Sequence, residues 1–189
     1  MTNVPGQRCS DEAIQQVVAI AGQDAGAGIR AADALLVQFP DDARLHFLKG
    51  SLLIGQRRHI AAHAALVRAV ELDPGFAIAR FQLGFFELTS GEVEASRQTL
   101  APLLELPDTH YLKLFALGLD SLVHDRFAEC IERLRQGQAL NQENLPLNRD
   151  MDLIIGKCQE LVGPSQTSGD DVSATSLLLR SPGVGQRLN

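Results

Sequence analysis

The hydrophobic pattern of residues 43–76 predicts two antiparallel helices. Apolar side chains at Leu45, Phe47, Leu48 and Leu52 follow helical spacing in its first half. The turn residues of 55–58 then reverse the chain. The second half continues with small and apolar residues until an Asp-Pro pair at 73–74 ends it.

The pattern of this stretch recurs at a fixed step of 34 residues. Three columns keep the same residue in each copy, namely Phe47, Phe81 and Phe115, then Gly50, Gly84 and Gly118, and then Leu66, Leu100 and Leu134. A small residue recurs in a fourth column, as Ala62, Ser96 and Cys130. A constant period of this length predicts an array of helical hairpins.

The periodicity predicts four helix pairs and one final helix. The expected elements are 11–22 with 24–38, the pair within 43–74, 76–90 with 92–106, 110–124 with 126–140, and a capping helix at 147–162. Pro102 falls inside the second helix of the third pair and is expected to kink or shorten it, because proline cannot donate a backbone hydrogen bond. The capping helix has Met151, Ile154, Ile155, Cys158 and Leu161 spaced for one face.

The repeat array is expected to be the only folded domain, at residues 10–162. Residues 1–9 are interpreted as a flexible arm. Residues 163–189 have a small and polar composition that predicts a disordered tail. Within that tail, the segment Val172–Arg180 carries three consecutive leucines and is either an accidental apolar run or a short docking segment.

The repeat resembles the tetratricopeptide repeat (TPR) family. Its matching positions in the unit 43–76 are Gly50, Leu53, Ala62, Leu66, Ala69 and Pro74, and the next two units have a Leu-Gly pair at 83–84 and 117–118. The sequence departs from the pattern at His46, Arg80 and Leu114, where the family often has tryptophan, and at Lys49. The resemblance implies an all-α, TPR-like solenoid of about four helix pairs plus a capping helix. It says little about function, because repeat scaffolds serve many partners.

The resemblance also implies a concave face lined by the first helix of each pair. The positions that would form this peptide-binding groove are Arg44, Phe47, Ser51, Ile78, Phe81, Phe85, Leu88, Leu112, Phe115 and Leu119. Most are large and apolar, and the segments 79–90 and 111–122 are apolar nearly all round, so something is expected to cover them. The alternative is that the array curves tightly and buries these side chains against one another.

We therefore expect a non-catalytic protein–protein interaction module, an adaptor or a chaperone-like protein. An apolar peptide or an amphipathic helix would occupy the hydrophobic groove, supplied by another protein, by a second copy of the chain or by its own segment Leu177–Leu179. The alternative function is a structural subunit that self-assembles through its repeat surfaces. A carboxylate clamp is disfavoured, because Arg44 is the only basic residue among the expected groove positions.

Composition changes this picture little. A net charge of −6 disfavours nucleic-acid binding, and no apolar run is long enough for membrane insertion. Three cysteines without a motif are typical of a reducing compartment, and we expect the cytoplasm.

No enzyme, metal or cofactor motif emerges from the residues. His59 and His63 share a helix face but lack an obvious third ligand, and Cys130 is interpreted as a buried packing residue. The glycine-rich stretch 21–28 does not end in the Lys-Ser/Thr pair of a phosphate loop. We expect no catalytic residues, no metal and no cofactor.

Overall fold

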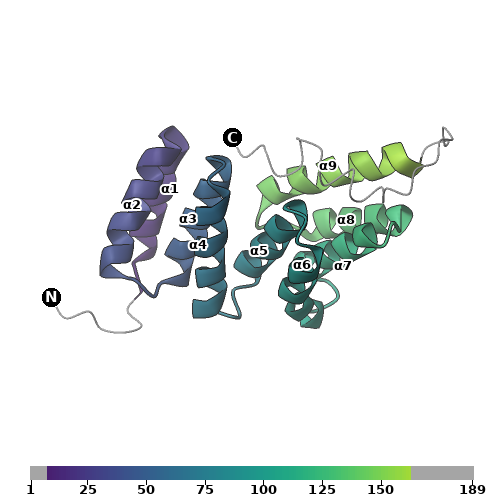
Figure 1. The fold of residues 1–189 in the computed structure, drawn as a ribbon, viewed down its shortest axis with the longest axis horizontal. Coiled ribbons are helices and arrows are strands. Elements are labelled where there is room, and N and C mark those ends of the chain that lie inside the picture. The colour runs from purple at the N-terminus through teal and green to yellow at the C-terminus, as the bar shows by residue number, and fades with distance from the viewer. Residues whose placement is uncertain (1–7, 163–189) are drawn as a thin grey trace. The chain divides into compact units, whose positions relative to one another are not determined.

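The computed structural model describes residues 8–162, in which all regular secondary structure is helical (Figure 1). The helices are α1 (Asp11–Gln23), α2 (Ala25–Gln38), α3 (Ala43–Gly55), α4 (His59–Leu72), α5 (Ala77–Thr89), α6 (Val93–Leu100), the 3₁₀ helix η1 (Ala101–Glu105), α7 (Tyr111–Val123), α8 (Phe127–Leu140) and α9 (Leu145–Val162). The all-α prediction is confirmed for these residues. The predicted tail 163–189 and its docking segment lie outside them, as do residues 1–7.

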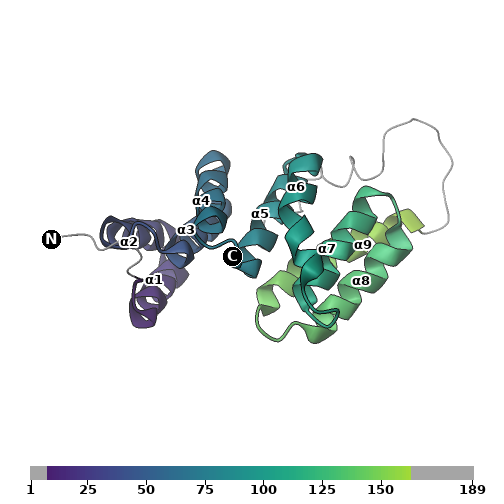
Figure 2. The ribbon, with the colours of Figure 1, turned by 90° about the horizontal axis from the view of Figure 1, so that it is seen from below.

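The chain divides into two compact units, with the boundary after Leu83 inside α5. Unit 1 contains α1 to α4 and the first half of α5, and its neighbouring helices pack as α1 on α2, α2 on α3 and α3 on α4. Unit 2 contains the rest of α5 and the helices from α6 to α9, with α7 packed on α8 and α8 on α9 (Figure 2). Within 8–162, none of these helices combines the length and apolar character needed to cross a membrane.

The turn between paired helices has the same geometry in three consecutive hairpins. Arg57, Gly91 and Asp125 all have positive φ, at 56°, 87° and 55°, and they lie 34 residues apart. In each turn the next residue donates its N–H to a carbonyl five residues earlier, as Arg58 does to Leu53 at 3.0 Å. This left-handed closing residue satisfies the free carbonyls at the end of the first helix. The backbone conformation of the turn therefore recurs with the same 34-residue period as the sequence.

At the repeated glycine, the two helices of a hairpin approach each other closely. A Cβ at Gly118 would lie 2.6 Å from Cδ2 of Leu134, and equivalent atoms at Gly50 and Gly84 would collide with Leu66 and Leu100 in the same way. All three leucines are buried. The invariant pair of glycine and leucine therefore fixes the distance between the helices in each hairpin.

Departures from the TPR pattern have local partners in unit 1. His46 Nε2 lies 2.8 Å from the Pro40 carbonyl oxygen, and Arg80 donates to the Pro74 carbonyl oxygen, which is the equivalent acceptor one repeat later. Lys49 forms an ion pair with Asp33 of α2 at 2.6 Å. These polar side chains thus bind neighbouring segments where the family often has apolar ones.

Pro102 shortens the second helix of the third pair, as the sequence predicted. α6 ends at Leu100 after eight residues, whereas α4 and α8 each have fourteen. The chain continues as the 3₁₀ helix η1, with Pro102 in its first turn. A proline there has no N–H to return to residue 98, so the α-helical ladder stops.

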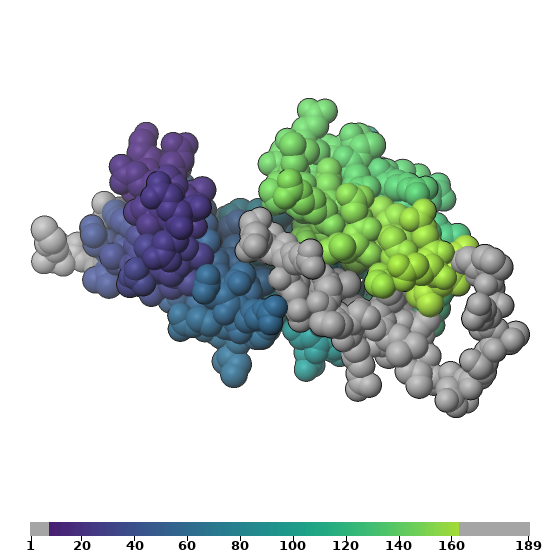
Figure 3. All heavy atoms as spheres, turned by 90° about the horizontal axis from the view of Figure 1, so that it is seen from above, coloured from purple at the N-terminus to yellow at the C-terminus, as the bar shows by residue number. Residues whose placement is uncertain are grey.

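The last helix starts two residues earlier than predicted, at Leu145, because Pro146 is tolerated in a first helical turn. The buried Asn141 organises the preceding loop through its amide, which donates to the carbonyl oxygen of Asn144 and to Oδ1 of Asn148, both at 2.7 Å. Figure 3 shows α9 (yellow-green) on the surface of unit 2. Its predicted inner face is buried from Met151 to Cys158, but Leu161 at its end is 39% exposed.

Replacing Gly118 by alanine should destabilise the protein by about 1–2 kcal/mol, because the added methyl group forces the buried Leu134 out of its position. Gly156 is the matched control, since a Cβ there meets no atom within 4 Å. Gly156→Ala should stabilise α9 by up to about 1 kcal/mol through helix propensity. Chemical denaturation of both variants measures the difference, and equal effects at the two sites would refute the close-approach argument.

The raised pKa of Asp150 on α9 should make the stability of the protein depend on pH. Desolvation raises the pKa of its carboxyl to about 6, above the unfolded value of about 3.9. The folded state therefore holds this proton more tightly, and the contribution to stability is lost as pH rises from about 4 to about 6. Asp150→Asn should stabilise the protein by about 1 kcal/mol at pH 7, after allowance for partial exposure, and by nothing below pH 4. Parallel stability curves for the two proteins across this range would contradict the assignment.

Candidate functional site

The ten predicted groove residues divide evenly between the two units. Six are buried, namely Phe81, Phe85, Leu88, Leu112, Phe115 and Leu119, and four are half-buried, namely Arg44, Phe47, Ser51 and Ile78. The apolar side chains among these ten residues are therefore buried or half-buried, and none is fully exposed to water. The groove as a peptide-binding site remains a prediction, and each unit contributes its own local arrangement.

Arg44 belongs to an ion-pair cluster at the start of α3. Its guanidinium contacts Asp42 Oδ2 at 2.7 Å and Asp11 Oδ1 at 2.6 Å, and it donates to the Cys9 carbonyl oxygen at 2.6 Å. Burial acts to raise the pKa of Asp42, but hydrogen bonds from Arg44 and from the Cys9 N–H outweigh it and hold the pKa below its usual value. Arg44 therefore ties the segment before α1 to α3. Residues 1–9 were predicted to be a flexible arm, but the side chain of Cys9 is buried.

Phe47 and Ser51 have partners within unit 1. The Phe47 ring lies 5.1 Å from the Phe76 ring, centroid to centroid, at an interplanar angle of 60°. The Ser51 hydroxyl lies 2.7 Å from Oε1 of Gln82 on α5, which links the first helices of two successive pairs.

Phe115 packs inside the pair of α7 and α8. A Cβ at Gly137 of α8 would lie 2.5 Å from two carbons of the Phe115 ring, so this ring occupies the space beside the glycine. Tyr111 meets the same ring edge-on at a centroid distance of 5.8 Å. Phe115 is thus buried inside its own helix pair.

Leu88 and Leu119 come together at an apolar cavity of about 80 Å³ in unit 2. The cavity lies among α5, α6, η1 and α7, and its lining consists of Leu88, Val93, Ser96, Arg97, Leu100, Ala101, Leu104, Ala116, Leu119, Asp120 and Val123. Its size is roughly half that of an apolar cavity that holds benzene, which leaves room for one branched aliphatic side chain.

The early end of α6 explains the position of this cavity. A longer α-helix would continue along α7, but the chain turns into η1 after Leu100, and Leu104 remains 39% exposed. The second-helix residues of the cavity, such as Val93 and Leu104, were absent from the sequence-based site. The signal that could have indicated them is Pro102, since a truncated second helix exposes the apolar helix beside it.

Two charged side chains of opposite sign also line the cavity and face solvent. Arg97 forms an ion pair with Glu94 at 3.1 Å, and Asp120 forms one with Arg126 at 2.9 Å. The hydrogen bond from Arg97 lowers the pKa of Glu94. The cavity thus combines an apolar interior with a charged edge.

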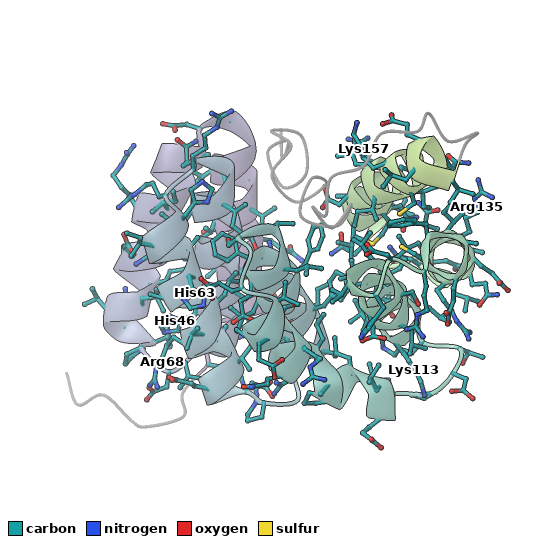
Figure 4. All side chains as sticks on the ribbon, turned by 45° about the vertical axis from the view of Figure 1, so that its right-hand side comes forward. His46, His63, Arg68, Lys113, Arg135 and Lys157 are labelled. Atoms are coloured by element: carbon teal, nitrogen blue, oxygen red, sulfur yellow. The ribbon has the colours of Figure 1, made fainter. Side chains whose placement is uncertain are left out.

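The histidines considered as metal ligands lie on the surface of α4, where Figure 4 labels His63. Among residues 8–162, no three side chains of histidine, cysteine, aspartate or glutamate gather in a metal-binding group.

Comparison with models of known protein families found no match, and comparison with curated proteins found none either. The likeness to the TPR family thus remains a prediction. The structure itself supports the coarser description for residues 8–162, an all-α arrangement of helices packed in neighbouring pairs.

Ala116→Leu should fill the cavity and leave stability unchanged or raise it by up to about 1 kcal/mol, because the new methyl groups enter existing space. The same change at Ala62, which is wholly buried in the core of unit 1, should cost about 1–3 kcal/mol by overpacking. Thermal and urea unfolding of the two variants provides the measurement. A loss at Ala116 as large as that at Ala62 would mean that the cavity cannot accept a side chain.

Proposed function

We propose that this chain is a non-catalytic protein-interaction module, an adaptor or chaperone-like protein, that binds a peptide segment through one apolar side chain. The observation that carries the proposal is the cavity lined by Leu88 and Leu119, two positions that the resemblance to the TPR family assigns to the groove. A leucine-sized anchor is suited to its volume.

The chemistry of the cavity favours an amphipathic partner. Its interior is formed mainly by aliphatic side chains, whereas Arg97 and Asp120 offer both charges at the solvent side. A partner helix with one apolar stripe can bury a leucine inside and place polar residues opposite these charges. Burying such a side chain contributes roughly 1.5–3 kcal/mol. Further contacts along the neighbouring helices are needed for micromolar affinity.

The test is a selection of displayed peptides on the full-length chain, followed by fluorescence anisotropy with the selected peptides. Ala116→Leu should weaken binding at least tenfold, since the new side chain occupies the anchor's space. The matched control is Ala95→Leu, the same change at an exposed position of α6 outside the cavity lining, which should bind like the wild type. Peptides that bind all three proteins equally would show that the cavity is not the binding site.

Two related measurements distinguish other occupants. Light scattering of the wild-type chain and Ala116→Leu tests self-assembly, because an oligomer that disappears on filling the cavity would make a second copy the partner. Leu178→Asp in the full-length chain tests the C-terminal segment. Tighter peptide binding by that variant would mean that the chain's own leucines compete for the site.

A further inference from the structure

The two cysteines of unit 2 face each other between α8 and α9. The Sγ atoms of Cys130 and Cys158 are 3.8 Å apart, and both side chains have 0% exposure. Lys157, the residue before Cys158, points outward from α9 in Figure 4 and pairs with Glu160 on the same surface. The helix thus directs the sulfur of Cys158 inward, against α8.

One cysteine of the pair lies at a position of the 34-residue repeat, and the other lies on the final helix, outside the repeat. Cys130 occupies the repeat's small-residue position, held by Ala62 and Ser96 in the two preceding units. Cys158 lies on the inner face of α9, between Ile154 and Ile155 on one side and the end of the helix on the other. Small size explains Cys130 alone, but it does not explain why the residue that meets it is also a thiol.

The two thiols are hydrogen-bonded to each other and unequal in acidity. This bond, with burial as a second cause, raises the pKa of Cys130, and the same bond lowers the pKa of Cys158. The thiolate is the reactive form of cysteine in oxidation and disulfide formation. The first thiolate therefore forms at Cys158, with a protonated partner in van der Waals contact.

We propose that Cys130 and Cys158 are a redox-modification site, at which a peroxide forms a reversible disulfide that ties α9 to α8. The sulfurs must approach from 3.8 Å to the bonding distance of about 2.05 Å, which side-chain rotation and a small helix shift can provide. Oxidation of this pair changes the strength of one helix–helix contact without adding a ligand.

The reaction balances with hydrogen peroxide as the oxidant. The Cys158 thiolate attacks one peroxide oxygen and breaks the O–O bond, which gives a sulfenic acid and one water after protonation. The Cys130 sulfur then attacks the sulfenic sulfur, the S–S bond forms and a second water leaves. Two thiols lose two electrons and two protons in total, and the peroxide is reduced to two waters.

Access of the oxidant depends on movement of α9. Because neither sulfur is exposed, peroxide reaches the pair when α9 opens away from α8. Reaction is thus slower than at an exposed thiol. Once formed, the disulfide closes a chain segment of moderate length and should resist thermal unfolding.

The experiment oxidises the folded full-length chain with graded hydrogen peroxide, removes the peroxide, and then unfolds the chain in denaturant so that an alkylating reagent traps every remaining thiol. Intact mass spectrometry should show one alkylated cysteine, Cys9, in place of three, and a non-reducing digest should contain the 130–158 linked peptides. The melting temperature should rise by about 5 °C and return after reduction.

Three variants define the outcome. Cys9→Ser should behave like the wild type, whereas Cys130→Ala and Cys158→Ala should form no intramolecular link and show no rise in melting temperature. Cys130→Ala introduces the residue that the unit 43–76 has at the equivalent position, Ala62, so it is expected to fold. The proposal is overturned if all three thiols remain alkylatable after native oxidation, or if the links formed involve Cys9 or a second molecule.

Discussion

The close approach of paired helices at a glycine is the constraint on which the rest of this structure depends. Gly50, Gly84 and Gly118 leave no room for a side chain, because a buried leucine of the opposite helix fills that space in each hairpin. Tight contact there sets the separation of the helices and with it the reach of every side chain between them. The positive-φ residue that closes each turn brings the second helix back at the position this contact requires.

The third hairpin keeps that contact but loses the later part of its second helix. Gly84 meets Leu100 in the usual way, and Leu100 is also the last residue of α6. Packing is thus retained from the turn to Leu100, while Pro102 diverts the chain two residues later. The apolar surface of α7 loses its full helical cover, and the cavity beside Leu119 is the result. A single residue can in this way open a site without disturbing the contact that holds the hairpin together.

The sequence predicted the helices and turns better than it predicted the packing neighbours of individual side chains. The 34-residue step gave the helices and turns because glycine, leucine and the turn residues act locally. The surroundings of Arg44 depended on Cys9 and Asp11, which lie more than thirty residues away and share no pattern with it. Residues at the same position of the repeat also have different packing neighbours. The Phe47 ring contacts the Phe76 ring, whereas Phe115 packs beside Gly137. Periodicity assigns a residue to a helix face, but burial depends on which neighbour covers that face.

The last helix shows how electrostatics and thiol chemistry can act on one contact. Asp150 and Cys158 both lie on α9, and α9 packs on α8. Above pH 6 the carboxylate of Asp150 is charged in a desolvated place, which lowers the stability of the folded state. Higher pH also increases the thiolate fraction of cysteine. The loss of folding stability and the reactivity of the sulfur pair therefore both increase with pH, and the proposed disulfide would offset that loss by linking α9 to α8.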